Sequence, residues 1–124
     1  MDVTESPSRF PRRLYEQGDE PDPRYSLANE RTFLAWTRTS LALLAAGVAL
    51  EAFALPIQPG LRLAAALILI LTGIAAPLQA WVGWFLAERA MRLNRPLPSP
   101  TFAAPLAIAV ILAGILVAVG LLLT

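Results

Sequence analysis

The chain has 124 residues and is 56% hydrophobic and 15% charged, whereas ordinary soluble domains are about 45–50% apolar and about 25% charged. This composition indicates a membrane protein, and a net charge of +1 provides no general attraction for nucleic acid. The chain has no Cys and no His, which excludes disulfides and thiolate nucleophiles and removes the commonest metal ligand and general base. We therefore expect a protein that is not an enzyme, with no catalytic residue, no metal, no cofactor and no nucleic-acid partner.

Residues 1–25 are polar and are interrupted by four prolines. Too little of this segment can be buried to offset the entropy of ordering it. We expect a disordered cytoplasmic tail, of which residues 1–20 are dispensable for membrane insertion and folding. The basic and partly apolar stretch from Arg9 to Tyr15 permits a second interpretation, in which the tail rests on anionic lipid headgroups.

Three apolar runs follow the tail, and each is longer than the ~20 residues that cross a hydrocarbon core of ~30 Å. They predict an all-α membrane protein, in which residues 26–124 form a three-helix transmembrane domain. The helices are expected at about residues 27–55, 61–88 and 102–124. Ser26 is the expected N-cap of the first helix, and the Pro-rich residues 56–60 predict the turn after it.

The distribution of arginines predicts how the chain is oriented in the membrane. The first loop contains only Arg62, and the C-terminal end contains no basic residue. Eight arginines lie in the tail, the first helical turns or the second loop, which three spans place on the same side of the membrane: Arg9, Arg12, Arg13, Arg24, Arg31, Arg89, Arg92 and Arg95. Because basic residues collect on the cytoplasmic side, we expect a cytoplasmic N-terminus. Trp81, Trp84 and Phe85 then fit an aromatic belt at that interface, and packing on another helix is an equally good explanation for Trp81.

The first helix begins with a dense group of polar residues at the threshold of its apolar run. The candidate site residues among them are Asn29, Glu30, Arg31 and Arg38. Arg31 and Arg38 are seven residues apart, so they share one helix face. The small residues on or near that face are Ala35, Ala42, Ala45 and Ala49. A charged side chain in hydrocarbon costs at least ~2.5–3.5 kcal/mol, so we expect this face to be turned away from lipid.

The depth of these residues permits a simpler interpretation. Arg38 and Glu51 are thirteen residues apart, which is ~20 Å along a helix, in a hydrocarbon core of ~30 Å. The two side chains therefore cannot sit at opposite interfaces without strain. Arg38 can instead extend to the cytoplasmic phosphates, while Glu51 reaches the outer headgroups and meets Arg62.

Three helices form a thin bundle, which can hide one face of the first helix. If the arginine-bearing face is not neutralised within one chain, self-association around it is the natural solution, and we expect a homo-oligomer in the lipid bilayer. A ring of arginines suits anions. Phosphate is the leading class, because a guanidinium group binds phosphate oxygens bidentately.

The second loop begins with a basic cluster, Arg89, Arg92 and Arg95, directly after Glu88. Glu88 and Arg92 have the i,i+4 spacing of a weak helical ion pair. The cluster either acts only as a determinant of topology or joins Arg31 in a cytoplasmic vestibule.

Two stretches, NERTFLAW at residues 29–36 and ERAMRLNRPLP at residues 88–98, carry a family resemblance. From Asp22 to the C-terminus the chain resembles the bacterial inner-membrane family typified by YidH, the domain-of-unknown-function family 202. Members have three transmembrane helices, so the resemblance implies a multi-pass protein of the bacterial cytoplasmic (inner) membrane. The same module resembles the membrane domain of the eukaryotic vacuolar transporter chaperone, whose subunits assemble around a path for polyphosphate. This implies that Glu30 and Arg31 line or gate an anion path, while Arg38 matches only the bacterial pattern.

Two functions are compatible with these observations. The first is a small integral inner-membrane component of an oligomer, in which arginines of the first helix pass or sense phosphate or polyphosphate. The alternative is a non-transporting assembly or regulatory subunit that binds another membrane protein or anionic lipid. An enzyme is a distant third, because Glu30, Glu51 and Glu88 are too scattered to form a catalytic constellation. The chain carries no attached polymerase domain, so synthesis of polyphosphate is not implied.

Overall fold

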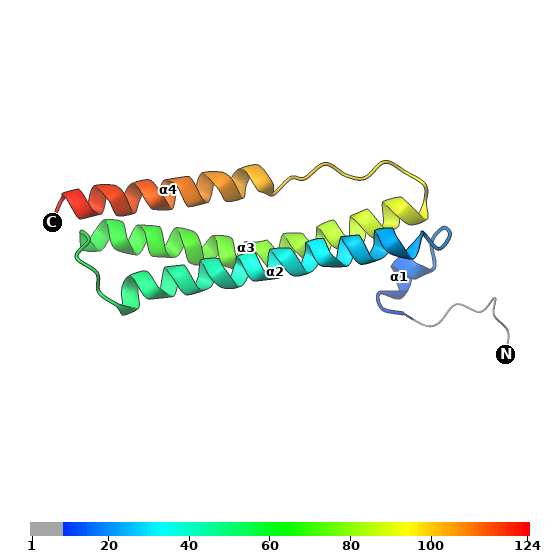
Figure 1. Ribbon diagram of the computed structural model, residues 1–124, viewed down its shortest axis with the longest axis horizontal. Helices are drawn as coiled ribbons and strands as arrows, with labels where there is room; N and C mark the ends of the chain where they lie inside the picture. Colours follow the sequence, from blue (N-terminus) through cyan, green and yellow to red (C-terminus); the bar gives the residue numbers. More distant parts are fainter. Residues whose placement is uncertain (1–8) are drawn as a thin grey trace.

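The computed structural model describes residues 9–124, which form one short helix followed by three long ones. In chain order the elements are α1 (Arg12–Tyr15), α2 (Pro23–Ala52), α3 (Pro59–Arg92) and α4 (Ala103–Leu122), and the described part contains no strand (Figure 1). The three long helices are each long and apolar enough to cross a membrane. The predicted all-α fold with three transmembrane helices is therefore confirmed, and the orientation of its termini stays a prediction.

α2 begins earlier than the sequence predicts, at Pro23 instead of about residue 27. Asp22 is the N-cap, since a carboxylate oxygen of Asp22 accepts a hydrogen bond from the Arg24 backbone N–H at 2.9 Å. Proline at the first helical position has no N–H to satisfy, which favours this start. The expected N-cap at Ser26 is wrong, because Ser26 lies one turn inside the helix, where its hydroxyl donates a hydrogen bond to Glu88.

α3 is the central helix, because it packs against both α2 and α4, while α2 and α4 do not pack against each other. Glycines let α2 and α3 approach closely: a Cβ added at Gly47 would lie 2.8 Å from the Ala66 carbonyl oxygen, and one at Gly73 would crowd α2. The Ser40 hydroxyl donates a hydrogen bond across this contact to the Gly73 carbonyl oxygen. The buried residues of α2 are Ser40, Leu43 and Gly47.

α4 covers only part of the length of α3, so α2 and α3 extend beyond it at one end (Figure 1). At that end of α4, Phe102 packs edge-on against Trp36 of α2, with ring centroids 5.5 Å apart. At the other end, the Thr124 hydroxyl donates a hydrogen bond to the Pro56 carbonyl oxygen at 3.1 Å. The 20 residues of α4 span ~30 Å, which is the thickness of a hydrocarbon core. The first turns of α2 and the last turns of α3 therefore lie outside the slab that α4 marks.

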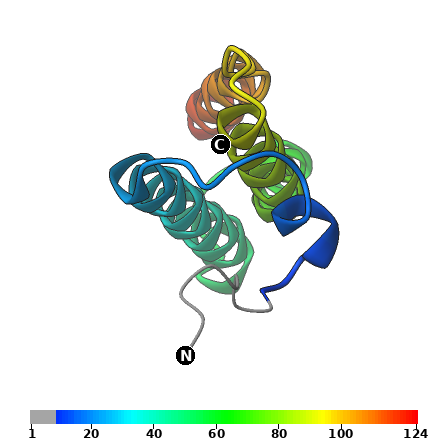
Figure 2. The same cartoon turned by 90° about the vertical axis from the view of Figure 1, so that its right-hand side faces the viewer.

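The segment before α2 folds back on the extended end of α3, and α1 lies on the side of the bundle away from α4 (Figure 2). Leu14 of α1 is completely buried, and Phe10 stacks on Trp81 with ring centroids 6.1 Å apart. This differs from the disordered tail that the composition predicts for residues 1–25, because Leu14 is buried in the folded protein, which no sequence pattern reveals. Residues 1–8 of that predicted tail lie outside the described residues.

Candidate functional site

The arginine face of α2, defined by Arg31, Ala35, Arg38, Ala42 and Ala45, is exposed. Within residues 9–124, neither guanidinium group has a hydrogen bond or an ion pair. The buried side of α2 points to α3 instead, and α4 does not reach α2 to cover the remaining face. The expectation that the arginine face is turned away from lipid therefore stays a prediction.

The position of α4 locates the two arginines relative to the slab it marks. Arg38 is two residues beyond Trp36, so it lies ~3 Å inside the level of Phe102. Arg31 is five residues before Trp36 and lies ~8 Å outside that level. Both side chains are thus close to one interface. At the other end of α2, Arg62 Nε donates to a Glu51 carboxylate oxygen at 3.2 Å. This is the ion pair that the sequence suggests as one possibility for Glu51.

Asn29 joins α2 to α3 outside the slab. Its side-chain N–H groups donate to the Trp84 carbonyl oxygen at 3.0 Å and to one carboxylate oxygen of Glu88 at 3.2 Å. The Ser26 hydroxyl donates to the other carboxylate oxygen of Glu88 at 3.1 Å. Glu88 is only 2% exposed, and these neutral donors are its partners among the described residues. The expected Glu88–Arg92 pair does not form, because Arg92 points to the tail.

Arg92 fastens the tail to the end of α3. Its guanidinium group is 4% exposed and donates to the carbonyl oxygens of Gln17 at 2.8 Å and Tyr15 at 2.9 Å, and to Glu20 at 3.3 Å. Gly18 passes the backbone of Arg92 so closely that a Cβ there would collide with the Arg92 carbonyl oxygen, and its φ of +58° also favours glycine. The tail and the end of α3 therefore form one packed unit.

The tail pocket is a cavity of about 200 Å³ between this packed tail and the first turns of α2. Its charged residues are Arg9, Glu20, Glu30, Glu88 and Arg92. The structure thus brings Glu30, one of the predicted site residues, to the same pocket as Arg92 from the predicted vestibule. The other arginines of the predicted vestibule do not join this pocket. Arg31 does not line it, and Arg95 is exposed. Arg89 instead donates from Nε to the Gln17 side chain at 2.9 Å.

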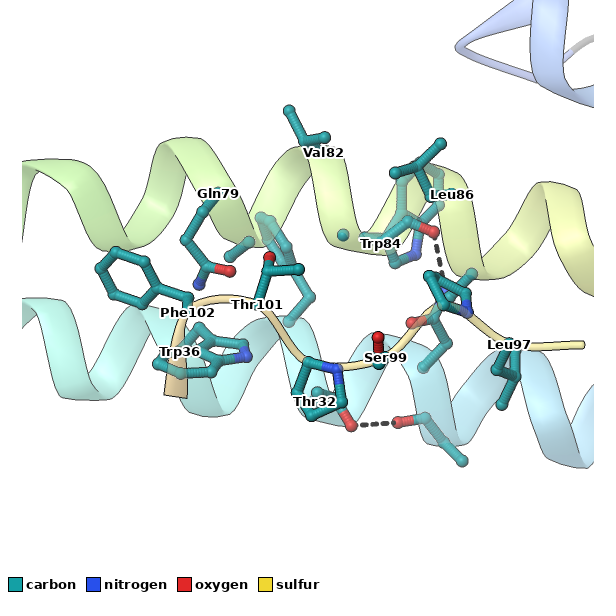
Figure 3. Close-up of a pocket in the computed structure, with 18 of the residues that line it drawn as sticks. Thr32, Trp36, Gln79, Val82, Trp84, Leu86, Leu97, Ser99, Thr101 and Phe102 are labelled. Atoms are coloured by element: carbon teal, nitrogen blue, oxygen red, sulfur yellow. Dashed lines mark hydrogen bonds between the residues drawn. The ribbon is translucent and has the colours of Figure 1, made fainter. Parts of the chain in front are cut away.

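A larger and mostly apolar groove of about 710 Å³ lies on another side of the extended helices, where only the loop after α3 covers the contact between α2 and α3. Figure 3 shows Ser99 and Thr101 of this loop crossing between the two helices, with Trp36 beside Phe102 at the end of the groove. Nothing in the sequence pattern indicates this groove, because it depends on α4 being much shorter than α2 and α3.

The buried roles of Glu88 and Arg92 are what sequence reasoning missed. Arg92 lies in the stretch predicted as a loop, although α3 continues through it to Arg92, and Glu88 is the last residue of the predicted second helix. One signal in the sequence could have indicated these buried positions. The small residues Ala87 and Ala90 stand among the charged ones, and a neighbouring segment can approach a helix closely at small residues. In residues 9–124 no group of three or more His, Cys, Asp or Glu is placed to hold a metal ion.

The fold and the site define a class: an integral membrane protein of three spanning helices, whose polar residues gather where two of those helices pass beyond the third. Comparison with known proteins then identifies the family. Residues 24–90, which cover most of α2 and α3, match the family described as "Domain of unknown function (DUF202)". The chain belongs to this family, as the motif around Asn29 suggests.

The chain is 45% identical to the inner membrane protein YidH of Escherichia coli K12 over 87 residues, which cover 69% of this chain and 76% of that protein. It is 42% identical to the uncharacterized protein Rv2272 of Mycobacterium tuberculosis H37Rv over 97 residues, which cover 77% of this chain and 80% of the relative. No solved structure matches the chain. Together with the three membrane-spanning helices, these relatives place the chain in the bacterial inner membrane.

Proposed function

We propose that this protein is a non-enzymatic component of a homo-oligomer, in which the arginine face of α2 lines a path for phosphate or polyphosphate. The isolation of Arg31 and Arg38 carries this proposal. Both are exposed and lack a partner within residues 9–124, whereas Arg62 and Arg92 are paired with carboxylates of the same chain. A charged group at the edge of the hydrocarbon region favours a protein or aqueous environment over lipid, so a second copy of α2 is a suitable cover.

The small residues of the arginine face would let copies of α2 approach one axis and would leave room beside the guanidinium groups. Copies that turn this face inward would bring guanidinium groups around one axis, with Ala35 and Ala42 beside them. Glu30, exposed at the neighbouring position, would orient Arg31 or moderate its field. Planar guanidinium groups bind phosphate oxygens in pairs, which supports phosphate as the anion. The resemblance of the NERTFLAW motif to the membrane domain of the vacuolar transporter chaperone supports the same class.

One observation favours the alternative of a non-transporting subunit that binds anionic lipid or another membrane protein. The level of α4 puts Arg38 only ~3 Å inside the slab, from where a long side chain reaches the headgroups. In that case the arginine face holds lipid phosphates in place and nothing passes along it.

Anion flux into liposomes that contain the purified protein separates these functions. We expect phosphate flux above that of empty liposomes, a partial loss for Arg31→Lys, and a larger loss for Arg31→Ala and Arg38→Ala. Lysine keeps the charge and loses the paired donors, which is why its effect is intermediate.

Arg13→Ala is the matched control, because Arg13 is an exposed arginine of α1 away from the arginine face. It should transport as the wild type does. Two results would exclude the path and leave the non-transporting subunit. One is flux no higher than that of empty liposomes, and the other is equal flux in the wild type and all four substituted proteins.

A further inference from the structure

The tail pocket already contains an anion, and this anion belongs to the chain itself. One carboxylate oxygen of Glu20 accepts a hydrogen bond from Arg92 Nη1 at 3.3 Å and also pairs with the Arg9 guanidinium group. Two arginines, one from the tail and one from the end of α3, therefore converge on one oxygen atom. The Glu20 side chain is 55% exposed while that of Arg92 is 4% exposed, so water reaches the carboxylate and does not reach the buried cation.

Arg92 does not depend on Glu20 for its position. Its Nε and Nη2 donate to the carbonyl oxygens of Gln17 and Tyr15, which leaves Nη1 as the group that faces the pocket. The ring of Tyr15 lies beside both arginines, with its centroid 4.1 Å from Arg9 Cζ and 5.2 Å from Arg92 Cζ. If Glu20 swings out to solvent, the Arg92 guanidinium group remains oriented towards the space that its carboxylate leaves, because the carbonyl oxygens of Gln17 and Tyr15 still hold it.

The other wall of the pocket decides which anion fits there. Glu30 and Glu88 both line it, and a buried carboxylate repels an anion that carries no proton. Glu88 is held by Ser26 and Asn29, so it cannot turn away. A protonated phosphate group offers acceptor oxygens to the arginines and one O–H donor to a carboxylate. Sulfate has the same shape and has no O–H at neutral pH.

We propose that the tail pocket binds a protonated phosphate group, and that Glu20 occupies this site as an internal competitor. A volume of about 200 Å³ suits one such group and is smaller than the ~300–1,000 Å³ of ordinary ligand pockets. The ligand is inorganic phosphate or the phosphate monoester of a lipid headgroup, which share this chemistry. The site does not rest on the proposed anion path, since none of its residues belongs to the arginine face.

Removal of the competitor should strengthen binding. If Glu20 fills the site about 90% of the time, the apparent affinity is about tenfold weaker than that of the open site. Glu20→Gln removes the charge and keeps the size of the side chain. We therefore expect Glu20→Gln to bind phosphate about tenfold more tightly than the wild type.

Titration calorimetry on the full chain in phosphatidylcholine nanodiscs tests this with inorganic phosphate, and with sulfate at equal ionic strength. The control is Glu16→Gln, because Glu16 is a tail carboxylate whose partner is Arg12 and which does not line the pocket. Arg92→Gln should abolish binding. Trypsin cleavage between Arg13 and the buried Leu14 reports whether the tail of each variant stays folded. A second set of nanodiscs that contain phosphatidic acid tests the lipid source.

The proposal expects saturable phosphate binding, no sulfate binding, a tenfold gain for Glu20→Gln with unchanged trypsin cleavage, and wild-type behaviour of Glu16→Gln. Reduced phosphate binding in phosphatidic acid nanodiscs would assign the site to the lipid headgroup. Equal binding of phosphate and sulfate would overturn the proposal, and so would a Glu20→Gln protein that binds no more tightly than the wild type. Because this experiment measures binding in variants that retain Arg31 and Arg38, its failure leaves the flux experiment unaffected.

Discussion

Glu88 and Asn29 show how single polar residues fix the position of α2 on α3 outside the membrane slab. Within residues 9–124 the buried carboxylate of Glu88 has no ion pair, and its hydrogen bonds come from Ser26 and Asn29. Asn29 also donates to the Trp84 carbonyl oxygen, so it makes two hydrogen bonds from α2 to α3. The motif residue Asn29 therefore has a structural role.

Asn29→Ala should destabilise the protein by about 1–3 kcal/mol, because it leaves a buried carboxylate oxygen without its donor. Thermal unfolding in detergent, followed by helix circular dichroism, measures this. Thr32→Ala is the matched control: Thr32 lies on the same helix and its hydroxyl donates only to the Ala28 carbonyl oxygen at 3.2 Å. Equal melting temperatures for the two variants would show that the Asn29 bonds contribute nothing.

Asp22 gives the start of α2 a pH dependence. Hydrogen bonds from the Arg24 side chain and backbone lower the pKa of Asp22 below its ordinary value of 3.8. Because the pKa of Asp22 is lower in the folded protein than in the unfolded chain, the ionised carboxylate stabilises the fold fully above its unfolded-state pKa. This stabilisation is lost as the pH falls through the folded-state pKa, which lies below 3.8.

Asp22→Asn keeps an N-cap and removes the charge. Helix content of the wild type should therefore fall more steeply than that of Asp22→Asn between about pH 5 and about pH 2, roughly one unit above and two units below the ordinary carboxyl pKa, when both are followed by circular dichroism in detergent. Parallel curves for the two proteins would mean that the carboxylate of Asp22 is not held in the folded protein.

At the scale of the elements, the contact between α2 and α3 depends on the absence of side chains. A Cβ at Gly47 would lie 2.6 Å from Ile70 and 2.8 Å from the Ala66 carbonyl oxygen, and a backbone atom cannot rotate away. Gly47→Ala should therefore cost about 1–3 kcal/mol. Gly114 of α4 has nothing within 4 Å of an added Cβ, so Gly114→Ala should be neutral or gain up to about 1 kcal/mol from helix propensity. In unfolding experiments in detergent, stability should decrease from Gly114→Ala through the wild type to Gly47→Ala. A Gly47→Ala protein as stable as the wild type would refute the close packing.

The three long helices could be predicted from the sequence because hydropathy and proline positions mark them, although α2 begins earlier and α3 ends later than predicted and α1 was not predicted. The polar start of α2 indicated a candidate site. The partners of Glu88 and Arg92 could not be predicted, because they come from segments more than fifty residues away in the chain. Ser26 shows the same limit: its type suits an N-cap, and the tertiary contact with Glu88 together with the Asp22–Pro23 start gives it another role. The level of Arg38 in the membrane also required the structure, since it follows from where α4 begins.

For the whole molecule, three spans and a cytoplasmic N-terminus predict that the C-terminus lies outside and the loop of residues 93–102 lies inside. The tail pocket, with Arg9 and Arg92, would then face the cytoplasm. Reporter fusions after Thr124 and within the loop test this orientation. A cytoplasmic signal at Thr124 would contradict it and would place the tail pocket on the other side of the membrane.

The central claim is that the arginine face of α2 is covered by a second copy of the chain. Disulfide cross-linking in native membranes tests it most directly, because the chain has no Cys of its own. Ala42→Cys lies on the arginine face, and Ile108→Cys, at an exposed position of α4 that is 65% exposed, is the control. We predict oxidant-dependent covalent dimers for Ala42→Cys and only monomers for Ile108→Cys. Monomers for Ala42→Cys, together with labelling by a lipid-soluble thiol reagent as strong as at Ile108→Cys, would show that the arginine face meets lipid and would contradict the account.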